Sequence, residues 1–72
     1  MNNLSIRQDF AKRLRKLREI NNLTQQELAE LADLDYKHIQ KLESNYPTNV
    51  KLETINKLAK AFKMKCAELL NF

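Results

Sequence analysis

The side chains best suited to chemistry in this sequence gather in one short segment, residues 36–44. Lys37 and Lys41 are four residues apart, and on a helix, where each residue turns by about 100°, this spacing places both ammonium groups on one side. Ile39 and Leu42 fall on the opposite side. Further polar groups lie beside the lysines, namely Tyr36, His38, Gln40 and Ser44. Such groups can donate hydrogen bonds to base edges and to phosphates.

Other chemistries lack the residues they need. The chain holds one cysteine, Cys66, one histidine, His38, and no glycine. A zinc site requires three or four Cys or His ligands and a phosphate-binding loop requires glycines, so we expect no metal and no cofactor. No carboxylate or nucleophile is positioned beside His38, which makes an enzyme the poorest interpretation. We expect Cys66 to be a buried small apolar group rather than a redox sensor.

Length and composition indicate one intracellular domain over residues 1–72. At 8.5 kDa and 43% hydrophobic residues the chain can bury one small core. A lone cysteine fits a reducing cytosol, and the absence of any apolar run of membrane-spanning length favours a cytoplasmic protein without a membrane partner. The net charge is +4. A basic chain attracts phosphates, and such binding weakens with salt.

Helical spacing of apolar residues runs through the chain, with no alternation of strand length. We expect a first helix with Ser5 as its N-cap, ending at Asn21 and Asn22, because Asn tolerates the left-handed conformation. Its apolar stripe comprises Ile6, Phe10, Leu14 and Leu17. Its cations Lys12, Arg13, Arg15 and Lys16 fit a solvated face, because most surface charge serves solubility.

The two middle helices have clear start signals. Thr24 and Glu27 form a capping box, which predicts a second helix of about eight residues. Its apolar face comprises Leu28, Ala29, Leu31 and Ala32. Asp35 is a suitable N-cap for a third helix, only a few residues after Ala32. Two short helices joined this tightly form a helix-turn-helix pattern.

In the rest of the chain we expect a loop over residues 44–50, a fourth helix and a short fifth turn over residues 66–70. The apolar residues of the fourth helix are Leu52, Ile55, Leu58, Ala59 and Phe62. The fold class is therefore all-α, with five helices. Four residues near the C-terminus belong either to the core or to a dimer patch, namely Met64, Leu69, Leu70 and Phe72.

A family resemblance follows from these motifs. The segment TQQELAELADLDYKHIQKLES, flanked by FAKRLRKLRE and LETINKLAKAF, resembles the Cro/lambda-repressor-like helix-turn-helix domains, also called XRE-type. The resemblance covers about residues 6–70. It implies a compact five-helix lambda-repressor-like DNA-binding domain, with the helix-turn-helix at helices two and three.

The resemblance also implies roles for individual residues. Gln25 matches a residue that contacts a phosphate and steadies the recognition helix. Arg18 and Glu43 match positions that pair as ions in some members, and an unpaired carboxylate at such a semi-buried site would be costly. Family members read bases with the residues at the positions of Tyr36, Lys37 and Lys41. Their residues at the positions of His38 and Ser44 make flanking or backbone contacts.

The sequence departs from the family pattern at three places where glycine is common, which here hold Asp33, Asn45 and Lys63. Asp and Asn accept positive φ at modest cost, whereas Lys does so less willingly. We therefore expect the fourth helix to end differently. Val50 stands where the family often has proline before that helix.

Together these observations predict a sequence-specific DNA-binding transcriptional regulator, such as a repressor, that acts as a homodimer on a palindromic operator in double-stranded DNA. The alternative is an antitoxin or protein-interaction module of a toxin–antitoxin pair. Glu27 and Glu30 on the second helix could form an acidic surface that contacts RNA polymerase. A structural role is favoured, because Glu27 already takes part in the capping box.

Overall fold

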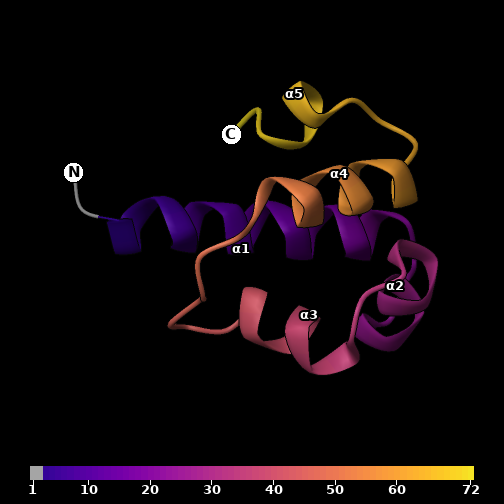
Figure 1. Ribbon diagram of the computed structural model, residues 1–72, viewed down its shortest axis with the longest axis horizontal. Coiled ribbons are helices and arrows are strands. Elements are labelled where there is room, and N and C mark those ends of the chain that lie inside the picture. The colour runs from indigo at the N-terminus through magenta and orange to yellow at the C-terminus, as the bar shows by residue number, and fades with distance from the viewer. Residues whose placement is uncertain (1–2) are drawn as a thin grey trace.

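The computed structural model describes residues 3–72, and every regular element among them is a helix (Figure 1). The elements are α1 (Asn3–Ile20), α2 (Gln25–Ala32), α3 (Tyr36–Leu42), α4 (Leu52–Ala61) and α5 (Cys66–Leu69). In Figure 1, α1 crosses the middle of the view, with α3 below it and α4 and α5 above it. The predicted all-α fold with five helices is confirmed.

The start of α1 differs from the prediction, because Ser5 lies inside the helix and not at its N-cap. Serine costs only a few tenths of a kcal/mol inside a helix, and a helix extends readily once its first turns have formed. Ile6 is 52% exposed, so it does not belong to the buried stripe. The core-facing stripe of α1 begins one turn later, at Phe10.

Three helices end on a residue in the left-handed conformation. Asn22 and Asp33 both have φ of 55°, and Lys63 has φ of 58°. In each case the following amide donates to a carbonyl five residues back, as Met64 does to Ala59 at 2.9 Å. The expected different end of α4 is therefore wrong. Its closing hydrogen bonds and the packing of the next side chain outweigh the cost of about 1 kcal/mol for a left-handed lysine.

The loop between α3 and α4 contains no left-handed residue. Asn45, which stands where relatives often have glycine, therefore needs no special backbone freedom here. After Glu43 the loop carries one buried residue, Pro47, and it leaves Tyr46 80% exposed.

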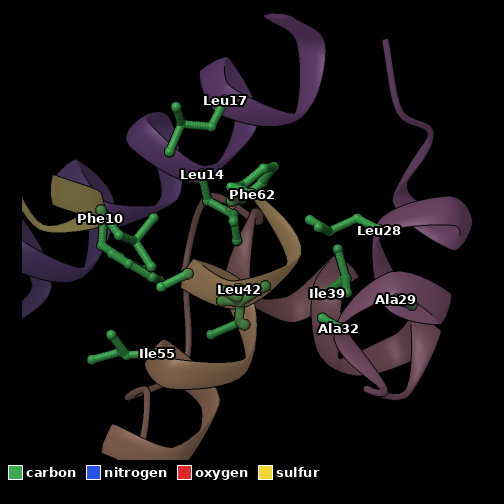
Figure 2. Packing of buried hydrophobic residues seen from close by; sticks show 13 residues of the cluster. Phe10, Leu14, Leu17, Leu28, Ala29, Ala32, Ile39, Leu42, Ile55 and Phe62 are labelled. Carbon is green, nitrogen blue, oxygen red and sulfur yellow. The ribbon is translucent and has the colours of Figure 1, made fainter. Parts of the chain in front are cut away.

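One apolar core receives side chains from all five helices (Figure 2). Leu14, Leu28, Ile39, Leu42, Leu58 and Leu69 have no exposed surface. Figure 2 shows Leu28 and Ile39 near each other where α2 meets α3, while Leu14, Phe62 and Leu42 lie together between α1, α4 and α3.

Two leucines predicted to be apolar-face residues are exposed instead. Leu31 is 59% exposed and Leu52 is 82% exposed. Leu52 is the first residue of α4, one turn before the side chains that enter the core, and Leu31 lies beside the buried face of α2 rather than on it. Periodicity identified the correct helices but assigned too many residues to their apolar faces.

The C-terminal residues divide between core and surface. Leu69 is fully buried, and Met64 packs half-buried against the core. Arg13 of α1 holds α5 by donating to the carbonyl oxygens of Glu68 at 2.8 Å and Leu69 at 3.2 Å. Leu69 thus has no surface to offer to a dimer.

Cys66 is exposed, so its predicted burial is wrong. It is the first residue of α5, and its Sγ lies 3.8 Å from the side-chain oxygen of Asn56 on the surface. A one-turn helix buries only the residue that faces the core, which here is Leu69.

Candidate nucleic-acid interface

The start of α2 is held by the predicted capping box. The Thr24 hydroxyl accepts from the Glu27 amide at 3.0 Å, and the Glu27 carboxylate accepts from the Thr24 amide at 2.8 Å. Two otherwise unpaired amides are thereby satisfied. At the start of α3, Asp35 has the extended backbone of an N-cap, but its side chain makes no capping hydrogen bond.

The outward side of α3 is polar, and its inward side is apolar. Lys37 and Lys41 are both exposed, whereas Ile39 and Leu42 have no exposed surface. The side-chain amide of Gln40 donates to the Tyr36 hydroxyl at 3.0 Å, which joins two exposed residues one turn apart.

Two further predicted site residues lie at the edges of this surface. The Ser44 hydroxyl donates to the Lys41 carbonyl at 2.8 Å, just beyond the end of α3. His38 is half-buried, so its imidazole is only partly available to a ligand. The predicted residues of α3 therefore form one continuous outward strip, with His38 at its margin.

Arg18 and Glu43 form a two-pronged ion pair behind α3. Arg18 Nε lies 2.8 Å from Glu43 Oε2, and Arg18 Nη2 lies 3.0 Å from Oε1. The side chain of Glu43 is 2% exposed and that of Arg18 is 15% exposed. This fork geometry matches the planar guanidinium to the carboxylate and fixes their relative orientation.

Glu43 collects three further contacts from other helices. Gln25, at the start of α2, donates to Glu43 Oε1 at 3.1 Å. Arg15 of α1 donates to the Glu43 carbonyl at 2.6 Å, and its Nε lies 4.0 Å from Oε1. Arg18 also donates to the Leu23 carbonyl at 2.9 Å. We call these five residues, Arg15, Arg18, Leu23, Gln25 and Glu43, the Glu43 network.

The Glu43 network joins α1, α2 and the end of α3. In the described part of the chain no buried side-chain nitrogen or oxygen lacks a hydrogen-bond partner. A buried carboxylate with several donors sets the position of the helix that carries it, because any displacement leaves a desolvated charge without partners. The hydrogen bond to Glu43 is the largest cause that raises the pKa of Arg18, so Arg18 remains cationic.

Sequence reasoning paired Arg18 with Glu43 but missed Arg15, which it assigned to the solvated face of α1. Arg15 sits three residues before Arg18 and so lies one turn away on the same side of the helix. That spacing was the available signal.

A shallow polar pocket lies at the N-terminal end of α3. It is lined by Arg18, Thr24, Gln25, Gln26 and Tyr36, with no acidic side chain among them. The first turn of α2 opens onto it, and the partial positive charge of a helix N-terminus adds to that of Arg18. Across residues 3–72 no group of three His, Cys, Asp or Glu side chains could hold a metal, and none of the helices has the length and apolarity needed to cross a membrane.

Comparison with known proteins agrees with this arrangement. The helix-turn-helix family model matches residues 14–69. A crystal structure of the restriction-modification controller protein C.AhdI from Aeromonas hydrophila is similar, with a TM-score of 0.81 and 38% sequence identity. The similarity covers 88% of this chain and 94% of that one. Among curated protein sequences there is no significant match.

Proposed function

This chain belongs to the XRE-type helix-turn-helix family of DNA-binding transcriptional regulators, and we propose that it recognises a specific double-stranded DNA site by inserting α3 into the major groove. On this proposal Lys37 and Lys41 contact base edges together with Tyr36, while Gln25 reaches a phosphate. His38 and Ser44 make flanking contacts.

One observation carries the proposal: the inward side of α3, opposite the polar strip, is held in place by the rest of the fold. Ile39 and Leu42 are fully buried, and Glu43 is bonded to side chains of both α1 and α2. Base recognition requires donors held to within a fraction of an ångström, and a helix fixed at its back supplies that precision. A merely solvated lysine pair needs no such support.

Selection of a site in a genome requires more than one α3. A single recognition helix touches only a few base pairs, so we propose that two copies bind a palindrome whose half-sites are about one helical turn apart. The two recognition helices then face the same side of the duplex. In a dimer the preference for specific over nonspecific DNA at one half-site is multiplied by the same preference at the other.

The proposed dimer surface consists of the two C-terminal dimer candidates that are exposed, Leu70 and Phe72. Leu70 is 41% exposed and Phe72 is 54% exposed, and both border a shallow apolar groove together with Ile6. The ring of Phe72 lies 6.3 Å from that of Phe10, which continues the core outward to the surface. We take a second copy of this chain as the occupant of the groove, because two-fold binding requires one; Met64, also a candidate from the sequence, does not line the groove.

The similarity to C.AhdI favours control of a restriction–modification system over an antitoxin role. That protein is described as a restriction-modification controller, and the similarity extends over nearly all of both chains. As a regulator of transcription the protein would act in the cytoplasm, and as a controller it would set the expression of its own system.

Selection of bound sites from random duplexes tests the proposal, followed by mobility shifts at two salt concentrations. The expected result is an enriched motif with two-fold symmetry, bound more weakly at the higher salt. Equal binding to every duplex would count against sequence-specific recognition. A stoichiometric protein partner in place of DNA would favour the antitoxin alternative.

A further inference from the structure

Arg13 of α1 is bonded to the end of α5. Its Nη2 donates to the Glu68 carbonyl at 2.8 Å, and its Nε donates to the Leu69 carbonyl at 3.2 Å. Carbonyl groups at the end of a helix lack partners within that helix, and a charged donor bonds them more strongly than a neutral one. The two donors of the planar guanidinium are fixed relative to each other. The pair of bonds therefore sets the direction of this turn as well as its place.

The opposite side of α1 is bonded to α3 and the residue that follows it. Arg15 donates to the Glu43 carbonyl at 2.6 Å, and Arg18 donates to its carboxylate at 2.8 Å. At about 100° per residue, Arg15 and Arg18 point about 160° and 140° away from Arg13 around the helix. Figure 1 accordingly shows α1 between α3 on one side and α5 on the other. One helix thus connects α3 to the C-terminal segment.

The proposed dimer surface begins directly after the carbonyls that Arg13 contacts. Leu70 and Phe72 follow Leu69 along the chain and are partly exposed, and the Phe72 ring lies 6.3 Å from that of Phe10 on α1. Burial of apolar side chains is sufficient for two copies to associate. The hydrophobic effect has no preferred direction, however, so it does not set the angle at which the copies meet. The hydrogen bonds from Arg13 can supply that direction.

Movement of the dimer surface relative to α3 changes the separation of the two recognition helices twice, once in each copy. Base pairs are about 3.4 Å apart along the duplex, and each turns by about 35° relative to the last. A shift of about 1.7 Å in each copy therefore equals one base pair of half-site spacing. A dimer surface held in one direction fits one spacing, whereas a loosely held surface fits several.

We propose that Arg13 is a positioning residue that sets the separation of the two recognition helices, and so determines which half-site spacing the dimer accepts. Arg13 does not line the apolar groove of the dimer surface, and it points away from the side of α1 that holds α3. It acts through α5. This inference rests on the proposed function and adds to it the residue that selects the spacing.

The test compares Arg13→Met with Lys16→Met. Lys16 is exposed, lies three residues further along α1 and borders Asn71 and Phe72 in the same shallow groove as Arg13. Within residues 3–72 it makes no hydrogen bond to α5. Both variants lose one positive charge, so a general loss of attraction to DNA is common to them. Binding is measured on the selected site and on duplexes whose half-sites are one base pair closer together or farther apart.

The wild type should bind the altered spacings about tenfold more weakly than the selected one, because the duplex must be deformed to fit. For Arg13→Met this ratio should fall to about threefold, as expected when a looser dimer surface relieves half of that free energy. Lys16→Met should keep the wild-type ratio. A merely structural role for Arg13 would weaken binding to all three duplexes equally and leave the ratio unchanged.

An unchanged ratio in Arg13→Met, or a wild type that binds all three spacings equally, would overturn the role of Arg13 and leave the proposed function standing. If the wild type selects a single half-site, the proposed dimer fails together with this inference, while recognition by α3 stands. If it binds no DNA, all of these proposals fail. Should Arg13→Met not fold by circular dichroism, Arg13→Lys keeps the charge without the fixed pair of donors. Its ratio should also fall below that of the wild type, and an unchanged ratio would overturn the inference.

Discussion

The helix-turn-helix region, residues 24–44, and the C-terminal region, residues 52–72, close their helices in the same way but expose different surfaces. Each region has a helix that ends on a left-handed residue, Asp33 in the first and Lys63 in the second. The first region buries a charged group, Glu43, and presents a polar strip to solvent. The second leaves Leu70 and Phe72 at the surface.

The difference lies in how each region is supported. The end of α3 is joined to α1 and α2 through charged and amide hydrogen bonds. The single turn of α5 depends on the burial of Leu69 and on two hydrogen bonds from Arg13. Directional bonds fix an orientation, which recognition of bases requires. Apolar burial fixes it less strictly, which is sufficient for the proposed dimer surface.

The largest expected effect comes from breaking the Glu43 network. Arg18→Met leaves the buried Glu43 carboxylate without its two-pronged partner, and the free energy of unfolding should fall by about 3 kcal/mol. Urea denaturation followed by circular dichroism measures the loss. The double variant Arg18→Met, Glu43→Leu should recover most of it, because it leaves no buried charge unpaired. A double variant no more stable than Arg18→Met would show that the pairing is not the cause.

The polar strip should show its effect in binding and not in stability. Lys41→Ala removes an exposed side chain, so unfolding should be unchanged within about 0.5 kcal/mol. Binding to the selected site should weaken by about 1–3 kcal/mol, with discrimination relaxed at one base position. Equal losses on the selected site and on random duplex would reassign Lys41 to a phosphate.

The apolar surface of the C-terminal region should show its effect in self-association. Phe72→Ala should raise the dimer dissociation constant about tenfold, as expected for removing a partly buried aromatic ring. Sedimentation equilibrium measures this constant. Leu52→Ala is the matched control, because Leu52 is 82% exposed and does not line the groove. An effect as large from Leu52→Ala as from Phe72→Ala would place the interface elsewhere.

The smallest effects concern two of the three left-handed residues, Asp33 and Lys63. Lys63→Gly should raise the free energy of unfolding by about 1 kcal/mol, since glycine adopts positive φ without a Cβ penalty. Asp33→Gly should gain less, because aspartate tolerates this conformation better than lysine. Thermal unfolding of both variants measures the difference. A loss of stability in Lys63→Gly would indicate that its side chain contributes more than its backbone costs.

Much of the fold could be predicted because local signals carry it. The Thr24 and Glu27 capping box, the stop at Asn22 and the apolar spacing of α4 each act within a few residues. Errors arose at edges: Ser5, Ile6, Leu31 and Leu52 all lie where a helix or its apolar face ends. Their burial depends on what packs against them, which spacing within one helix does not report.

The site was predictable in outline for a different reason. Helical periodicity placed Lys37 and Lys41 opposite Ile39 and Leu42, and a carboxylate near the inner face required a cation. Periodicity did not reveal that Arg15 contacts the backbone of Glu43, because that contact joins residues 28 positions apart. The exposure of Cys66 was missed for a similar reason, since only the docking of α5 decides which side of that turn is buried.

Base methylation interference on the selected DNA site tests the central claim most directly. Methylation of guanine N7 adds a group in the major groove, whereas methylation of adenine N3 adds one in the minor groove. If α3 reads the major groove, N7 methylation within each half-site should block binding, and Lys41→Ala should lose sensitivity at one such guanine. Interference from adenine N3 alone, with guanine N7 methylation tolerated throughout the half-sites, would contradict the account.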